Sequence, residues 1–148
     1  MALTGEHTVE IAAAIEDVYA IAADLEQAPE WQGSLQSVTI LERDADGRAV
    51  HVETISDAKV KTIRSRLRFS YDPATAIQWS QEKGDVKSLQ GRWTFDDLGG
   101  GRTRATYRLE VDPGRLLGML VRGPAEDRVR KALVNDAAEG LRTRAERR

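Results

Sequence analysis

The stretch that decides the fold is residues 9–31, VEIAAAIEDVYAIAADLEQAPEW, in which a strand pattern leads directly into an apolar helix. Val9 and Ile11 alternate with polar residues, which predicts a strand with one buried face. From Ile15 onward the apolar residues recur three or four positions apart, as in a helix that packs by one face. Pro29 ends this helix or begins a second short one. We therefore expect a strand followed by a V-shaped pair of helices.

Length and composition limit the function classes. The chain has 148 residues, enough for one domain with a real core. Charged residues make up 31% and hydrophobic residues 41%, and the net charge is −2, so nothing indicates a DNA partner. No window approaches the roughly 20 apolar residues of a membrane span, and the N-terminus lacks the order of a signal peptide. We expect a cytoplasmic protein without stable membrane insertion.

The chain has no cysteine and only two histidines, His7 and His51. Disulfides, thiolate nucleophiles and cysteine-ligated zinc are therefore excluded. Both histidines are expected on the surface, His7 before the first strand and His51 on the solvent face of the third. We expect no metal and no cofactor.

Six further segments have strand character, and turn residues bound each of them. They are residues 34–43, 49–55, 60–71, 76–81, 86–95 and 103–111. Their connections are short, for example DADG at residues 44–47. Short connections join antiparallel neighbours, so the segments are expected to form a meander.

The C-terminal third is predicted to be helical. Residues 116–121 form a short apolar segment that ends at Gly123 and Pro124. A longer helix is expected over residues 124–146, with one apolar stripe. The stripe consists of Val129, Leu133, Ala137 and Leu141. Such a helix needs a surface to cover, and the concave face of the preceding sheet supplies one.

This order of elements is accompanied by a set of characteristic positions. They are Val9, Ile11, Ile15, Val18, Asp24, Pro29, Trp31, Gly91, Trp93, Asp112 and Pro113. In these positions and in element order the chain resembles the START/Bet v 1-like (SRPBCC) superfamily, in particular its polyketide cyclase/dehydrase and lipid-transport branch. The resemblance implies an α+β helix-grip fold over residues 1–148. In that fold a seven-stranded curved antiparallel sheet wraps around a long C-terminal helix, and two short helices lie between strands 1 and 2.

Strand alternation assigns an inner face to the sheet. In residues 60–71, Ile63, Leu67, Phe69 and Tyr71 share one face, while arginines occupy the other. Aromatic side chains with a polar tip suit a flat, partly oxygenated ligand. The predicted ligand-binding residues are Trp31, Ile63, Leu67, Phe69, Tyr71, Trp79, Leu89, Trp93, Tyr107, Leu109, Leu120 and Leu133.

The same residues also suit a filled core. A helix with small members such as Ala132, Ala137 and Gly140 favours an open cavity over a filled one. Gly140 either allows close packing or leaves room at one end of the pocket. Gly91, inside a strand, indicates a bulge or a bend of the sheet.

Three functions remain open. We favour the binding or transport of a small hydrophobic or aromatic ligand such as a lipid, a quinone or a polyketide-like molecule. The alternative that the resemblance implies is a cyclase/aromatase that uses the same cavity. Tyr71 and Tyr107 face inward, but no inward carboxylate can be placed, and Asp24 has a structural role, so no catalytic residue is assigned.

The third possibility is an interaction protein that uses an arginine-rich outer face to bind a ribosome, RNA or an anionic membrane. The outward arginines are Arg64, Arg66, Arg68, Arg92, Arg104 and Arg108, and the tail adds Arg142, Arg144, Arg147 and Arg148. Cross-strand pairing with Glu53, Glu82 and Glu110 is the alternative, which we favour. An exposed edge strand also makes a homodimer possible.

Overall fold

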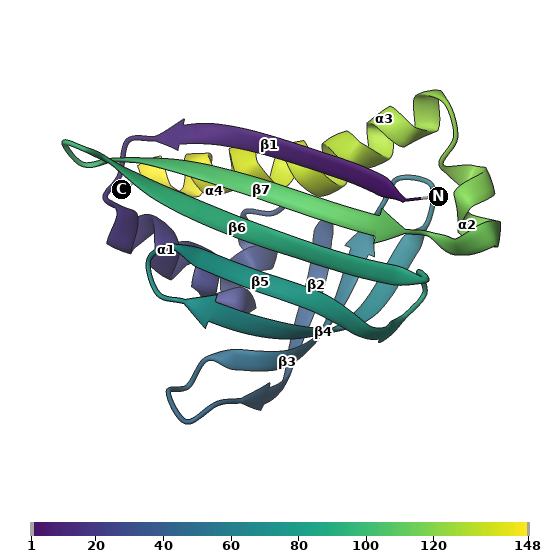
Figure 1. Ribbon diagram of the computed structural model, residues 1–148, viewed down its shortest axis with the longest axis horizontal. Coiled ribbons are helices and arrows are strands. Elements are labelled where there is room, and N and C mark those ends of the chain that lie inside the picture. Colours follow the sequence, from purple (N-terminus) through teal and green to yellow (C-terminus); the bar gives the residue numbers. More distant parts are fainter. Residues whose placement is uncertain (1, 148) are drawn as a thin grey trace.

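A seven-stranded antiparallel sheet curves around a long C-terminal helix in the computed structural model, which describes residues 2–147 (Figure 1). The strands are β1 (Leu3–Ile11), β2 (Leu35–Arg43), β3 (Ala49–Asp57), β4 (Thr62–Asp72), β5 (Ala76–Gly84), β6 (Ser88–Gly99) and β7 (Arg102–Asp112). Their order in the sheet is β1-β7-β6-β5-β4-β3-β2. The predicted meander is confirmed, and β1 pairs with β7 to become one edge of the sheet.

The helices lie between β1 and β2 and after β7. They are α1 (Ile15–Ala23), the 3-10 helix η1 (Leu25–Glu30), α2 (Gly114–Leu120), α3 (Pro124–Arg130), the π-helical turn η2 (Lys131–Asn135) and α4 (Asp136–Glu146). The helix predicted over residues 124–146 thus contains a π-helical turn in its middle. Its start is as expected, because Pro124 follows Gly123, whose φ of 63° interrupts the chain direction after α2.

Most strands are longer than the sequence pattern predicts. β1 begins at Leu3, well before the Val9 and Ile11 pair that predicted it, because Leu3 and Gly5 continue the same buried alternation. β5 extends to Gly84 past a register shift between Arg66 and Leu67 of β4.

The core lies between the concave face of the sheet and the C-terminal helices (Figure 1). Val129, Leu133, Ala137 and Leu141 are all buried, which confirms the predicted apolar stripe. β1 lies directly against this helix, and a Cβ atom at Gly5 would approach Val134 Cγ2 to 2.8 Å. Glycine at this position lets the strand and the π-helical turn approach closely.

His7 differs from its prediction as a simply exposed residue. Its side chain is partly buried, and its Nε2 lies 2.9 Å from Glu139 Oε2 of α4. The interaction ties the edge strand to the C-terminal helix. His51, predicted on the solvent face, lies between Glu42 and Glu82 at 3.3 and 2.9 Å.

Candidate ligand-binding pocket

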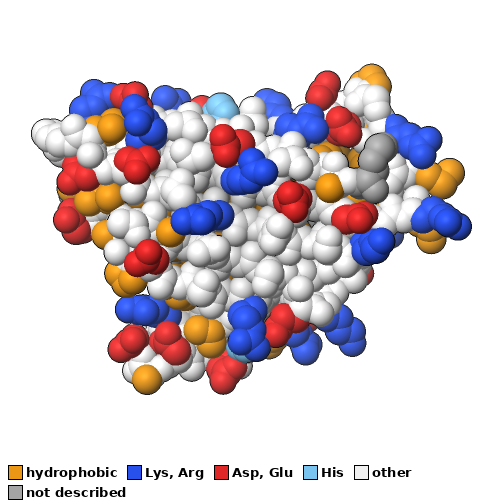
Figure 2. Space-filling view, in the orientation of Figure 1, with side chains coloured by type: hydrophobic (Ala, Val, Ile, Leu, Met, Phe, Trp, Pro, Cys, Tyr) orange, Lys and Arg blue, Asp and Glu red, His pale blue; other side chains and the backbone are white. Residues whose placement is uncertain are grey.

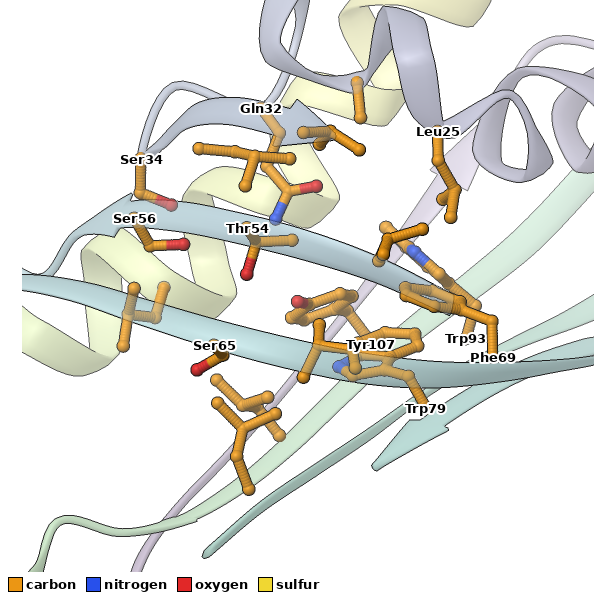
Figure 3. Close-up of a pocket in the computed structure, with 18 of the residues that line it drawn as sticks. Leu25, Gln32, Ser34, Thr54, Ser56, Ser65, Phe69, Trp79, Trp93 and Tyr107 are labelled. Atoms are coloured by element: carbon orange, nitrogen blue, oxygen red, sulfur yellow. The ribbon is translucent and has the colours of Figure 1, made fainter. Parts of the chain in front are cut away.

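A pocket of about 100 Å³ opens between the concave face of the sheet, the α1–η1 segment and η2 (Figure 3). Ten of the twelve predicted ligand-binding residues line it, namely Trp31, Ile63, Leu67, Phe69, Trp79, Leu89, Trp93, Tyr107, Leu109 and Leu133. Their convergence follows from strand alternation, since β4 to β7 each turn one face toward the C-terminal helix.

The other two predicted residues lie outside this lining. Tyr71 stacks on Phe69, and its hydroxyl donates a 2.6 Å hydrogen bond to the Ala49 carbonyl oxygen at the β3 edge of the core. Leu120 lies on α2 with 51% of its surface exposed. The apolar pattern of residues 116–121 did not distinguish the two faces of that short helix.

One end of the pocket is aromatic. Phe69, Trp79, Trp93 and Tyr107 come from four successive strands, and Figure 3 shows their rings grouped together. Ring centroids lie 5.4 Å apart for Phe69 and Trp79, 5.4 Å for Trp79 and Tyr107, and 4.6 Å for Trp93 and Tyr107. These contacts are stacked, tilted and edge-on respectively, and they fix the rings to one another. The result is a firm wall for a flat molecule.

Gly91 sets the position of Trp79 in this wall. The two residues are directly paired between β5 and β6, with no register shift beside them. A Cβ atom at Gly91 would overlap the Trp79 indole. Of the two alternatives predicted for this glycine, a bulge or a bend, the bulge is absent. The missing side chain lets an indole ring lie against the strand.

The other end of the pocket carries small polar side chains. Gln32, Ser34, Thr54, Ser56 and Ser65 point toward the cavity in Figure 3. Ser34, Thr54 and Ser65 are buried. The Ser65 hydroxyl donates a 2.9 Å hydrogen bond to Gln81 Oε1, which anchors it. Together with the aromatic wall, these groups make a pocket with one apolar and one hydrogen-bonding end.

This polar end was not predicted from the sequence. Ser65 shares the inward alternation of Ile63 and Leu67, and that parity is the signal that could have identified it. Gln32 and Ser34 follow η1 in a turn, where no periodicity assigns a direction.

The pocket lining contains no charged side chain. Its titratable group is the phenol of Tyr107. Burial raises the pKa of Tyr107, and a hydrogen bond with the Gln32 side chain offsets only part of that rise. The phenol is consequently neutral at physiological pH and available as a hydrogen-bond donor.

Trp31 contributes a further polar atom to this region. It is buried at the end of η1, and its Nε1 has no hydrogen-bond partner within residues 2–147. Its ring lies 6.3 Å from that of Trp93. A buried indole N–H without a partner is uncommon in folded proteins.

Known proteins share this architecture. The family model described as polyketide cyclase / dehydrase and lipid transport matches residues 11–138. The chain belongs to this family. No curated protein matches it in sequence.

Several solved structures share the fold. A START superfamily protein from Mycobacterium smegmatis is 23% identical, with 97% of each chain covered and a TM-score of 0.83. A protein from Thermus thermophilus is 21% identical, with 96% of each chain covered and a TM-score of 0.82. The Zhui aromatase/cyclase from Streptomyces sp. R1128 is 21% identical over 100% of this chain and 96% of that one, with a TM-score of 0.79. At these identities the likeness establishes the helix-grip fold.

The arginines of the outer sheet face are largely paired with carboxylates. The pairs are Arg64–Glu53 at 3.2 Å, Arg66–Glu53 at 3.9 Å, Arg68–Glu82 at 3.3 Å, Arg104–Glu10 at 3.9 Å and Arg108–Glu6 at 3.6 Å. Glu110, predicted as a third partner, instead accepts a hydrogen bond from Gln90, and carboxylates of β1 take its place. Figure 2 shows positive and negative side chains interspersed over the visible surface.

Partial desolvation raises the pKa of the Glu82 carboxyl, but hydrogen bonds from Arg68 and His51 outweigh it, so that the pKa lies below its usual value.

Arg92 has no ion pair within the described chain. In the tail, Arg142 pairs with Glu139 and Arg144 with Glu30. Arg148 lies outside the described residues.

Other site types find no support among residues 2–147. No group of three or more histidine or acidic side chains is arranged to hold a metal ion. No helix is long and apolar enough to span a membrane. Asp24, a predicted helix-end acid, is exposed at the junction of α1 and η1, and no side-chain hydrogen bond of a helix cap is formed there.

Proposed function

We propose that the protein binds a small, neutral, mainly apolar ligand in this pocket and acts as its carrier. The observation that carries the proposal is the lining itself. One end stacks four aromatic rings, the other offers an amide and several hydroxyls, and neither holds a charge. A flat ring system with a few oxygen atoms at one end matches both halves, with the ring against Trp79 and the oxygens toward Thr54 and Ser65.

Charge selects against other ligands. Moving a carboxylate or an ammonium into a buried site without a counter-charge is strongly unfavourable. The hydroxyls of Ser34, Thr54 and Ser56 can satisfy neutral carbonyl and hydroxyl groups but supply no counter-charge. Neutral lipids, quinones and uncharged polyketide-like rings therefore fit better than fatty acids or nucleotides.

Size sets a second limit. Sites that enclose drug-sized ligands have volumes of roughly 300–1,000 Å³, whereas this pocket holds about 100 Å³. A single ring fits the pocket as it stands, and a larger ligand requires the pocket to widen. A ligand that binds only the folded protein stabilises it by RT ln(1 + c/Kd) at a free ligand concentration c, so a thermal shift reports binding.

The test is native mass spectrometry of the protein purified from its host, followed by extraction and identification of the bound molecule. Leu89→Trp fills the pocket from a partly buried lining position, and we expect at least tenfold less bound ligand. Leu98→Trp, at the exposed end of the same strand, is the matched control and should bind normally. An apo mass under gentle conditions, with no thermal shift across a panel of lipids, quinones and aromatic polyketides, would contradict the proposal.

Tyr107 supports a second candidate, cyclisation of a polyketide-like chain. The family includes cyclases by its description, and the Streptomyces neighbour is an aromatase/cyclase. A neutral phenol beside Gln32 can polarise a ligand carbonyl by donating a hydrogen bond. Tyr107→Phe should leave ligand binding nearly unchanged in either case. The two candidates differ in turnover: a carrier has none to lose, whereas an enzyme should lose turnover by roughly 100-fold or more in this variant.

A further inference from the structure

Helix α2 has an apolar face on each side. Leu117, together with Val121 directly after the helix, packs against the core. Leu116, Met119 and Leu120 point the other way, with 80%, 63% and 51% of their surfaces exposed. Positions three and four apart share a face of a helix, so these three side chains form one continuous patch. Three neighbouring large apolar side chains exposed on a seven-residue helix require an explanation.

Basic side chains surround this patch. Arg115 lies on α2 four positions before Met119 and so shares its side of the helix. Arg122 follows two residues after the helix ends at Leu120. Lys59 and Lys61 belong to the β3–β4 turn, which meets α2 where Lys61 and Val60 line a small hollow together with Leu117. Figure 2 shows hydrophobic and basic side chains mixed at the end of the molecule where Figure 1 places α2.

The charges at this end are not neutralised as they are on the outer sheet face. Within residues 2–147, Arg115, Arg122, Lys59 and Lys61 form no ion pair, whereas the arginines of β4 and β7 are paired with glutamates. The acids that follow α2, Glu126 and Asp127, are both engaged by Arg130. The patch thus combines exposed apolar groups with uncompensated positive charge.

We propose that this patch, Leu116, Met119 and Leu120 with the four basic residues, docks the protein on an anionic bilayer surface. The three apolar side chains enter the boundary between headgroups and acyl chains. The arginines and lysines stay at the level of the lipid phosphates, their aliphatic stems extended along the apolar surface. This inference holds whether or not the pocket carries a ligand.

Area and charge favour a bilayer over a protein partner. A specific protein interface buries about 800 Å² on each partner, which three side chains on a two-turn helix do not provide. A second copy of the chain would bring a second set of unpaired cations against the first, since a two-fold contact places the same patch on both sides. An anionic lipid surface supplies the opposite charge and accepts a small apolar wedge.

Docking through α2 also orients the pocket. The hollow of about 30 Å³ beneath α2 is lined by Leu117 and Val121. It shares Ile63, Val111 and Leu133 with the main pocket. A bilayer in contact with α2 therefore lies at that end of the pocket, separated from it by a single short helix.

The experiment is flotation of the purified protein with vesicles of phosphatidylcholine containing about 30% phosphatidylserine. The wild type should float with these vesicles, and much less with pure phosphatidylcholine or at high salt. The triple variant Leu116→Ser, Met119→Ser, Leu120→Ser should reduce the bound fraction at least tenfold. Arg115→Glu with Arg122→Glu should do so on anionic vesicles. Arg64→Glu with Arg66→Glu, on the outer sheet face, is the matched control and should float within about twofold of the wild type.

Three results would overturn the proposal. The first is a wild type that does not float, and the second is a folded triple variant that floats as well as the wild type. The third is concentration-dependent self-association of the wild type in sedimentation that the triple variant abolishes, since the patch would then belong to a second copy. If the triple variant fails to fold, flotation of the Arg115→Glu, Arg122→Glu variant on anionic vesicles tests the proposal instead. Leu89→Trp should float normally, which separates docking from ligand binding in the pocket.

Discussion

Gly140 of α4 lies directly against the backbone carbonyl of Trp31, so closely that a Cβ atom at this glycine would overlap the carbonyl oxygen. The sequence left two explanations for a glycine inside this helix, and close packing is the correct one. The contact holds the end of η1, and with it the Trp31 ring of the pocket, against the C-terminal helix. A helix position thus fixes one wall of the site.

The first prediction concerns this contact. Gly140→Ala would gain about 1 kcal/mol from helix propensity. The added methyl group meets a backbone atom that cannot rotate away, and overpacking of this kind costs about 1–3 kcal/mol. We expect a net loss in the free energy of unfolding, measured by urea denaturation.

Gly118→Ala is the matched control for that substitution. Gly118 also lies inside a helix, but its Cβ would meet only Pro113 Cγ, at an ordinary 3.7 Å. This variant should be as stable as the wild type or slightly more stable. Equal losses for both variants would show that the Trp31 contact has no special effect.

The second prediction concerns two tyrosine hydroxyls. The Tyr19 hydroxyl is buried without a hydrogen-bond partner within residues 2–147, while that of Tyr71 donates to the Ala49 carbonyl at 2.6 Å. Removing an unpaired buried hydroxyl is favourable and removing a paired one is not, each by about 1 kcal/mol. Tyr19→Phe should therefore raise the melting temperature and Tyr71→Phe should lower it. Shifts of the same sign in calorimetry would refute this assignment.

The third prediction concerns alkaline pH. Burial raises the pKa of Tyr107 well above the ordinary value of 10.0. Above pH 10 the unfolded chain loses this proton and the folded chain keeps it. The contribution of Tyr107 to the free energy of unfolding is therefore fully present below pH 10. It is lost as the pH rises toward the pKa of Tyr107 in the folded protein. The loss is about 1.4 kcal/mol per pH unit for one such group.

Urea unfolding at several pH values between 9 and 11 measures this loss. Other groups also titrate in this range, so the informative quantity is the difference between the wild type and Tyr107→Phe. The variant should show the shallower fall with pH. Parallel curves would mean that Tyr107 ionises equally easily in the folded and unfolded states.

Strand alternation and turn residues were sufficient to predict the sheet and the aromatic wall of the pocket from the sequence. Trp93 and Tyr107 could be assigned to one face because a strand has only two faces and the opposite one carried arginines. Trp79 could be assigned inward because it alternates in step with Ile77. No such simple rule assigns the inward face of the short helix α2. Its apolar residues lie on both sides, so Leu120 was predicted in the pocket although Leu117 and Val121 are the inward pair.

Glycines were the least predictable positions, because their meaning depends on atoms far away in the sequence. Neither the indole of Trp79 over Gly91 nor the carbonyl of Trp31 against Gly140 is visible from local pattern. The π-helical turn at residues 131–135 is a similar case. It places Ala132, Leu133 and Val134 among the buried residues and was not distinguishable from ordinary helix by its periodicity.

The last prediction uses Gly91 to probe the pocket without touching a residue that would contact the ligand's polar end. Gly91→Ala must displace the Trp79 ring, which stacks on Phe69 and contacts Tyr107 at a tilt. We expect altered tryptophan fluorescence, a loss of about 1–3 kcal/mol in stability, and weaker binding of any aromatic ligand. Gly33→Ala, where a Cβ would meet nothing within 4 Å, is the control and should change none of the three. If Gly91→Ala weakens stability but leaves aromatic ligands bound as before, Trp79 belongs to the core and not to the ligand-binding wall.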